Sequence, residues 1–207
     1  MIKLAQLCVT NGEVTARQDG KLAIDTPSSR GTVQHSDGDT AELRFRYLGP
    51  SADSKPLASG EMRRQIGIKL HAQDSCNLLY VMWHIEPDSR IAVSIKRNPS
   101  EHTHAECHAN GYTNLHPIYE VAQRPLAQGE SHILRAELRG TQLTVLADGE
   151  RAWVGSVPGL GGIDGPVGFR TDNARFEFDY MAVIGAQVQR FAAGNESPNR
   201  CERQPGD

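Results

Sequence analysis

The sequence predicts an all-β protein built from two packed antiparallel sheets. Short segments of alternating apolar and polar residues recur along the chain, and this period of two is typical of strands that bury one face. Turn residues separate these segments, among them Asp37-Gly38, Gly49-Pro50 and Asp148-Gly149. Helical periodicity is almost absent. Many short strands with frequent turns indicate a sandwich or a barrel.

Four alternating segments in the first half of the chain are expected to be neighbours in one curved sheet. They cover residues 41–48, 62–71, 77–85 and 91–96, and their apolar positions would face the core. Their polar positions would form a shared cationic face, which together with a loop tyrosine supplies the candidate binding residues Arg44, Arg46, Arg63, Gln65, Lys69, His71, Lys96 and Tyr112. Such a face suits an anionic or hydroxyl-rich ligand, although a solvated sheet surface needs no ligand at all.

The strand pattern returns after a loop-rich stretch over residues 98–130. Alternation is evident over residues 131–139, 141–147, 151–157, 165–170 and 174–184. Asp148-Gly149 is a strong signal for a two-residue hairpin turn. We therefore expect one β-sandwich domain over residues 1–185, followed by a poorly ordered tail over residues 186–207.

Composition and charge exclude several classes of function. The net charge of −3 argues against general nucleic-acid binding, which normally needs a basic excess. No apolar run approaches the ~20 residues of a membrane helix, so no membrane insertion is expected. The first residues carry only a very short apolar stretch. The protein is therefore either cytoplasmic, or extracellular or periplasmic after removal of a signal peptide. The oligomeric state is left open.

The four cysteines, Cys8, Cys76, Cys107 and Cys201, are widely spaced and form no CxxC pair. This spacing is unlike that of a zinc ribbon or a redox motif. A disulfide between Cys8 and Cys201 would tie the two ends of the chain together. Isolated thiols in a reducing compartment are equally consistent with the sequence.

The closing strands carry a resemblance to a known superfamily. The run over residues 134–151 holds a strand, a one-residue turn at Gly140 and the Asp148-Gly149 hairpin, and residues 165–180 read G-P-V-G-F-R then F-E-F-D-Y. This order resembles the end of concanavalin A-like (laminin G/glucanase-type) jelly rolls. The resemblance implies a two-sheet sandwich with a ligand on its concave face. It also implies a structural calcium ion as an option, with Asp179 as the candidate, and no other cofactor.

The same superfamily includes lectins, carbohydrate-binding modules, glycosidases and polysaccharide lyases, and the fold does not choose among them. A retaining glycosidase needs two carboxylates about 5–5.5 Å apart. The Glu-x-Asp-x-x-Glu strand that supplies them in related enzymes is missing here. A two-carboxylate glycosidase is therefore not expected.

A lyase of a uronate-containing polysaccharide needs a cation or amide beside the uronate carboxylate and a Tyr or His as the base. Tyr80 and His84 would be its catalytic candidates. Residues 40–44 and 65–67 partially resemble the R-S/T-E-L-R and Q-I-H strands of jelly-roll alginate lyases. The first Arg is absent, however, and Gly67 stands in place of the His.

Two features of the loop region leave alternatives open. Residues 101–108 contain His102, His104, Cys107 and His108, which form either a weak metal site or a plain polar loop. Tyr112 is either a loop aromatic that stacks on a sugar or an ordinary turn residue. The sequence favours a noncatalytic module that binds a polysaccharide or oligosaccharide. A polysaccharide lyase is the first alternative, and an accessory interaction domain is the second.

Overall fold

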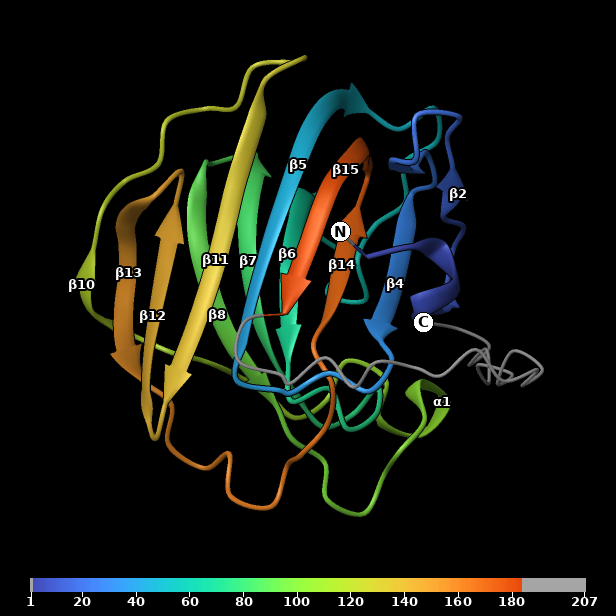
Figure 1. Cartoon of the computed structure of the whole chain (residues 1–207). Coiled ribbons are helices and arrows are strands. Elements are labelled where there is room, and N and C mark those ends of the chain that lie inside the picture. Colours follow the sequence, from blue (N-terminus) through green and yellow to red (C-terminus); the bar gives the residue numbers. More distant parts are fainter. Residues whose placement is uncertain (1, 184–207) are drawn as a thin grey trace.

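The computed structural model describes residues 2–183 and forms a sandwich of two antiparallel sheets, which lie one behind the other in Figure 1. Sheet A has the strand order β1 (Leu7–Asn11), β4 (Ser28–Val33), β14 (Gly168–Asp172), β6 (Arg64–Leu70), β7 (Leu78–Glu86), β8 (Arg90–Lys96) and β9 (Tyr112–Asn114). Sheet B has the order β10 (Pro117–Glu120), β13 (Glu150–Ser156), β12 (Gln142–Ala147), β11 (Ser131–Arg139), β5 (Thr40–Pro50), β15 (Ala174–Val183), β3 (Leu22–Ile24) and β2 (Thr15–Ala16). The prediction of a two-sheet all-β sandwich is confirmed.

Helices make a small contribution to the described residues. They are the short turn η1 (Leu4–Gln6) and the single helical turn α1 (His104–Cys107). No helix among residues 2–183 is long and apolar enough to span a membrane. The segment predicted to be a poorly ordered tail, 186–207, lies outside the described residues.

The core lies between the two sheets, because the apolar residues that alternate along each strand point inward and are buried there. Leu43 and Phe45 of β5 face Ile66 and Ile68 of β6, and all four side chains are fully buried. Trp83 of β7 lies edge-on to Phe45, with the ring centroids 6.0 Å apart. Burial of such side chains is the main stabilising contribution in a sandwich of this kind.

The expectation that the four early segments share one sheet is wrong for β5. Strands β6, β7 and β8 are neighbours in sheet A, but β5 lies in sheet B between β11 and β15. Strands on opposite sides of a common core show the same alternation, so the pattern could not separate them. Arg44 and Arg46 therefore lie on the outer side of sheet B, the face turned toward the viewer in Figure 1.

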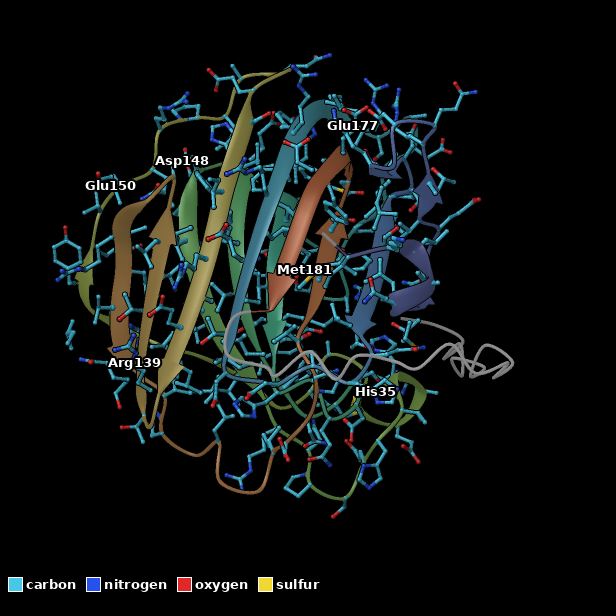
Figure 2. All side chains as sticks on the ribbon, viewed as in Figure 1. His35, Arg139, Asp148, Glu150, Glu177 and Met181 are labelled. Atoms are coloured by element: carbon cyan, nitrogen blue, oxygen red, sulfur yellow. A yellow bond between two sulfur atoms is a disulfide. The ribbon has the colours of Figure 1, made fainter. Side chains whose placement is uncertain are left out.

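The outer surface of sheet B is rich in charged side chains that pair with one another. Arg135 contacts both Glu42, at 3.7 Å, and Glu137. Figure 2 shows Arg139 at one end of this sheet and Asp148 and Glu150 at the other. These half-buried pairs are those of a solvated sheet surface and contribute little stability each.

A disulfide joins Cys76, in the loop between β6 and β7, to Cys107 at the end of α1. The sequence left this pairing open. The bond fixes the loop that carries α1 against the end of sheet A. The pairing of Cys8 with Cys201 that the sequence suggested is compatible with this bond but concerns a residue outside the described part of the chain.

Candidate functional site

The outer face of sheet A carries a hollow of about 510 Å³, which we call the central cavity. Its floor comes from the outward residues of four strands, Gln65, Tyr80, Met82, His84, Ser94 and Arg170. The loop over residues 57–63 forms one wall, and residues 109–120 form the other. This size is in the range of pockets that bind small organic ligands.

Strand register explains why these outward residues meet. Gln65 of β6 is opposite His84 of β7, and His84 is in turn opposite Arg90 of β8. On the other side of β6, Gln65 is opposite Asp172 of β14. Residues directly opposite one another in an antiparallel pair lie on the same face, so their side chains form one row across the sheet.

A smaller hollow of about 230 Å³, which we call the side pocket, adjoins the central cavity. The two hollows share a wall made of Leu57, Ala58, Tyr80, Ala109, Tyr112 and Arg170. They are therefore neighbouring parts of one depression over sheet A.

Aromatic rings and a guanidinium meet in that shared wall. The rings of Tyr80 and Tyr112 are stacked, with centroids 6.0 Å apart. The guanidinium of Arg170 lies 5.2 Å from the centre of the Tyr80 ring, and its Nη1 is 3.5 Å from the Tyr112 hydroxyl. A cation over an aromatic face is attractive and holds both groups in place.

Asp172 anchors this arrangement from below. Its carboxylate is 1% exposed and accepts hydrogen bonds from Arg170 Nε at 2.8 Å and from Gln65 Nε2 at 2.6 Å. Arg30 Nη2 lies 3.5 Å from the other carboxylate oxygen. Burial by itself would lower the pKa of Arg170, but the Asp172 carboxylate raises it, so the guanidinium remains charged.

His84 lies between two guanidinium groups on the floor of the central cavity. Arg63 Nη1 is 3.3 Å from its Nε2, and Arg90 Nε is 3.4 Å from its Nδ1. Burial, followed by the charges of Arg63 and Arg90, lowers the pKa of His84 to about 3. The imidazole is therefore neutral at neutral pH. A neutral ring has one acceptor nitrogen, so it can accept a hydrogen bond from only one of the two arginines at a time.

The structure brings together six of the residues that the sequence proposed for binding or catalysis. Arg63, Gln65, Tyr80, His84 and Tyr112 line the central cavity, and Lys96 lines the side pocket with Tyr80 and Tyr112. Lys69 is 4% exposed and lines neither hollow. His71, just after β6, is 2.8 Å from Asp39 and also lines neither hollow.

Arg44 and Arg46 are not part of this site. Both belong to β5 in sheet B, and Arg46 Nε donates a hydrogen bond to the Gly129 carbonyl at 2.9 Å. Asp179, the candidate for calcium, is on β15 in the same sheet, with one carboxylate oxygen 3.8 Å from Lys21 Nζ.

The sequence reasoning missed Arg170 and Asp172, which hold the centre of the site. Strand alternation in Gly168–Asp172 could have identified them. Phe169 and Thr171 face the core and are fully buried, so Arg170 and Asp172 face the opposite side of the sheet. In the sequence, these residues contribute only to the resemblance to a closing strand. Arg90, which also lines the central cavity, is not among the binding residues expected from the sequence.

The partial alginate-lyase motifs do not meet at the site. Residues 40–44 lie in sheet B, on the other side of the sandwich. Gly67 is in β6, but a Cβ atom there would collide with the Val81 carbonyl and with Met82 Sδ. The position that carries His in the Q-I-H motif therefore has no room for a side chain in this backbone.

The histidine-containing loop is held by other contacts. His102 Nδ1 is 2.9 Å from an Asp74 carboxylate oxygen, and Cys107 is bonded to Cys76. Within residues 2–183, no group of three or more His, Cys, Asp or Glu side chains is arranged to hold a metal ion.

Comparison with solved structures identifies the fold. The carbohydrate-binding module CBM66 from Bacillus subtilis superposes with a TM-score of 0.62 at 13% identity, over 85% of this chain and 93% of that one. The metal-free carbohydrate recognition domain of Emp46p gives 0.55 at 12% identity, over 86% of this chain and 87% of that one. The alginate lyase AlyC3 gives 0.52 at 9% identity, over 82% of this chain and 76% of that one.

These likenesses show that the chain has the concanavalin A-like jelly-roll fold that its closing strands indicated. No known family description and no curated protein sequence matches it. At such low identities the fold is shared, and the function has to be argued from the site itself.

Proposed function

We propose that this protein is a noncatalytic carbohydrate-binding module that holds a polysaccharide or oligosaccharide over the outer face of sheet A. The observation that carries the proposal is the tyrosine and arginine wall in an open depression. Tyr112, which is 42% exposed and stacked on the buried Tyr80, offers ring surface for the apolar face of a sugar, and Arg170 beside the pair donates hydrogen bonds to hydroxyl or acidic oxygens. Two of the similar structures are a carbohydrate-binding module and a carbohydrate recognition domain, which supports the same function.

The charge of the central cavity favours a saccharide with electronegative groups. Arg63, Arg90 and Arg170 line it together with the acids Glu61 and Glu120. Arg63 is ion-paired with Glu61, so its charge is partly compensated. The positive excess is modest, which is compatible with a neutral or a weakly acidic sugar in this part of the depression.

A polysaccharide lyase is the second candidate, because Tyr80, His84 and Gln65 line one cavity. Three observations weigh against it. A histidine with a pKa of about 3 is a weak general base at neutral pH. The Q-I-H position is Gly67, which has no room for a side chain, and residues 40–44 lie in the other sheet. An interaction domain without any saccharide ligand is the remaining alternative.

The Cys76–Cys107 disulfide supports a location outside the reducing cytosol, because such bonds persist in extracellular and periplasmic compartments. We therefore propose that the protein acts in an extracellular or periplasmic compartment.

A glycan array combined with ultraviolet absorbance tests the function. The wild-type protein should bind a defined subset of saccharides and should release no unsaturated uronate from any uronate polymer. Release of unsaturated product that is abolished by Tyr80→Phe or His84→Ala, with polymer binding kept, would replace the binder by the lyase. Failure to bind any saccharide, with no unsaturated product released, would favour the alternative of an interaction domain without a saccharide ligand.

A further inference from the structure

The side pocket differs from the central cavity in its charge. Its charged lining consists of two arginines and two lysines, one carboxylate and two histidines. These are Arg30, Arg170, Lys55, Lys96, Asp172, His104 and His108. With neutral histidines, four positive charges against one negative charge leave an excess of three. This is the most cationic hollow of the depression, and the central cavity holds three arginines against two glutamates.

The one carboxylate of the pocket is already engaged. Asp172 is 1% exposed and is held by Arg170, Gln65 and Arg30, at 2.8, 2.6 and 3.5 Å. It lies beneath the arginines and orients them. The positive charge that remains therefore faces the hollow, where the low dielectric of the surrounding protein strengthens its attraction for an anion.

Lys96, the backbone of Lys55 and the loop that carries the two histidines are held in place before any ligand arrives. Lys96 is 1% exposed, and its Nζ donates to the carbonyls of Ser75 at 3.1 Å and His108 at 2.8 Å. The backbone of Lys55 exchanges two hydrogen bonds, both 2.8 Å, with the side-chain amide of Asn173. The Cys76–Cys107 bond holds the loop that carries His104 and His108. A pre-organised site of this kind loses little entropy on binding.

The side pocket also has a defined position relative to the proposed saccharide. Tyr80, Tyr112 and Arg170 belong to the linings of both hollows. A sugar ring placed against the tyrosines in the central cavity can therefore direct a substituent into the side pocket.

We propose that the side pocket is an anion subsite that receives the carboxylate or sulfate group of an acidic saccharide bound in the central cavity. The proposal rests on the proposed function and names its ligand class, since a neutral polymer would leave this charge unused. Lys55, at the exposed rim, is the cation that can be changed with least effect on the fold, because only its backbone is bonded to Asn173.

The first experiment tests the pocket with small anions. Sodium sulfate and sodium acetate are titrated at constant ionic strength, and backbone amide NMR shifts are followed in wild type, Lys55→Gln and Lys21→Gln. Lys21 is the matched control, because it contacts Asp19 and Asp179 on sheet B and lies outside both hollows. We expect saturable shifts around the side pocket that Lys55→Gln weakens about 3- to 10-fold and Lys21→Gln leaves unchanged. The ion that saturates at lower concentration identifies the group, sulfate or carboxylate.

Shifts that never saturate, or that both variants weaken equally, would overturn the proposal, because they would report general screening. A second experiment separates this failure from a failure of the proposed function. Wild type and Lys55→Gln are compared on glycan arrays that pair acidic saccharides with their neutral counterparts. A wild-type preference for the acidic member that Lys55→Gln reduces supports the subsite.

Equal binding of both members by both proteins overturns the subsite and leaves saccharide binding intact. Binding of sulfate or acetate without binding of any saccharide overturns the proposed function and, with it, the assignment of the anion to a sugar.

Discussion

The rings of Tyr80 and Tyr112 are stacked with centroids 6.0 Å apart, although Tyr80 is in the middle of sheet A and Tyr112 is in its edge strand. Tyr80 is 4% exposed and Tyr112 is 42% exposed, so the pair extends from the buried floor of the depression to solvent. Lys96 Nζ lies 5.3 Å from the centre of the Tyr112 ring. The stack therefore joins the weakly cationic central cavity to the strongly cationic side pocket.

Replacing Tyr112 by Ala should weaken saccharide binding about 3- to 10-fold, because an aromatic contact of this kind contributes about 0.5–1.5 kcal/mol beyond burial. Titration calorimetry with the best array ligand measures the effect. Tyr119→Ala is the matched control, since Tyr119 is 46% exposed and, although its neighbours on β10 line the central cavity, lines neither hollow itself. Equal losses of affinity in the two variants would show that the stacked tyrosines are not part of the binding site.

His84 should make the protein less stable in acid. The ring has a pKa of about 3 in the folded protein and about 6.5 in the unfolded chain. Between these values the unfolded chain binds one more proton than the folded one, so stability falls as pH is lowered from 6.5 toward 3. The contribution of this one group reaches as much as about 5 kcal/mol.

Urea unfolding of wild type and His84→Gln at a series of pH values measures this difference. The variant should lose less stability between pH 7 and pH 4 than wild type does. His116→Gln serves as the control, because His116 is an exposed residue at the cavity rim. Parallel pH profiles for wild type and His84→Gln would contradict the assigned protonation state.

The Cys76–Cys107 disulfide should be a major contributor to stability. It closes a loop with a sequence separation of 31 residues, for which the chain-entropy relation gives about 3–4 kcal/mol. The double variant Cys76→Ser/Cys107→Ser should lose about that much in chemical denaturation. Its binding of acidic saccharides should fall more than its binding of neutral ones, because the loop with His104 and His108 lines the side pocket. A loss below about 1 kcal/mol would show that the loop is held by its other contacts.

Asp172→Asn should be strongly destabilising. Removing one partner of a buried ion pair leaves uncompensated charge and costs about 3–5 kcal/mol. The variant leaves Arg30 and Arg170 without their shared carboxylate. Asp179→Asn changes the same chemical group in a pair with Lys21 at 3.8 Å, and we expect a loss below about 1 kcal/mol. Thermal unfolding of the two variants compares the two sites directly, and similar losses would argue against the anchoring role of Asp172.

Much of the fold could be predicted from local patterns. Alternation identified Leu43, Ile66, Val81 and Trp83 as inward residues, and all four are buried. The closing strands led to the jelly-roll fold that the solved structures show. These features are readable because the side-chain direction of a strand depends only on the parity of each residue along it.

The site was only partly predictable, since it depends on which strands are neighbours. Parity assigned Gln65, Tyr80 and His84 to one polar face, and the three line one cavity. The same parity placed Arg44 with them, but β5 pairs with β11 and β15 in the other sheet.

Local patterns are enough to predict which residues of each strand face the core and that the strands pack as a sandwich. The contact of Gln65 with Asp172, 107 positions away, and the bond between Cys76 and Cys107 are visible only in the folded molecule. Strand pairing and disulfide formation join segments far apart in the chain. The free energy that selects such partners comes from the packing of the whole sandwich, and no local pattern records it.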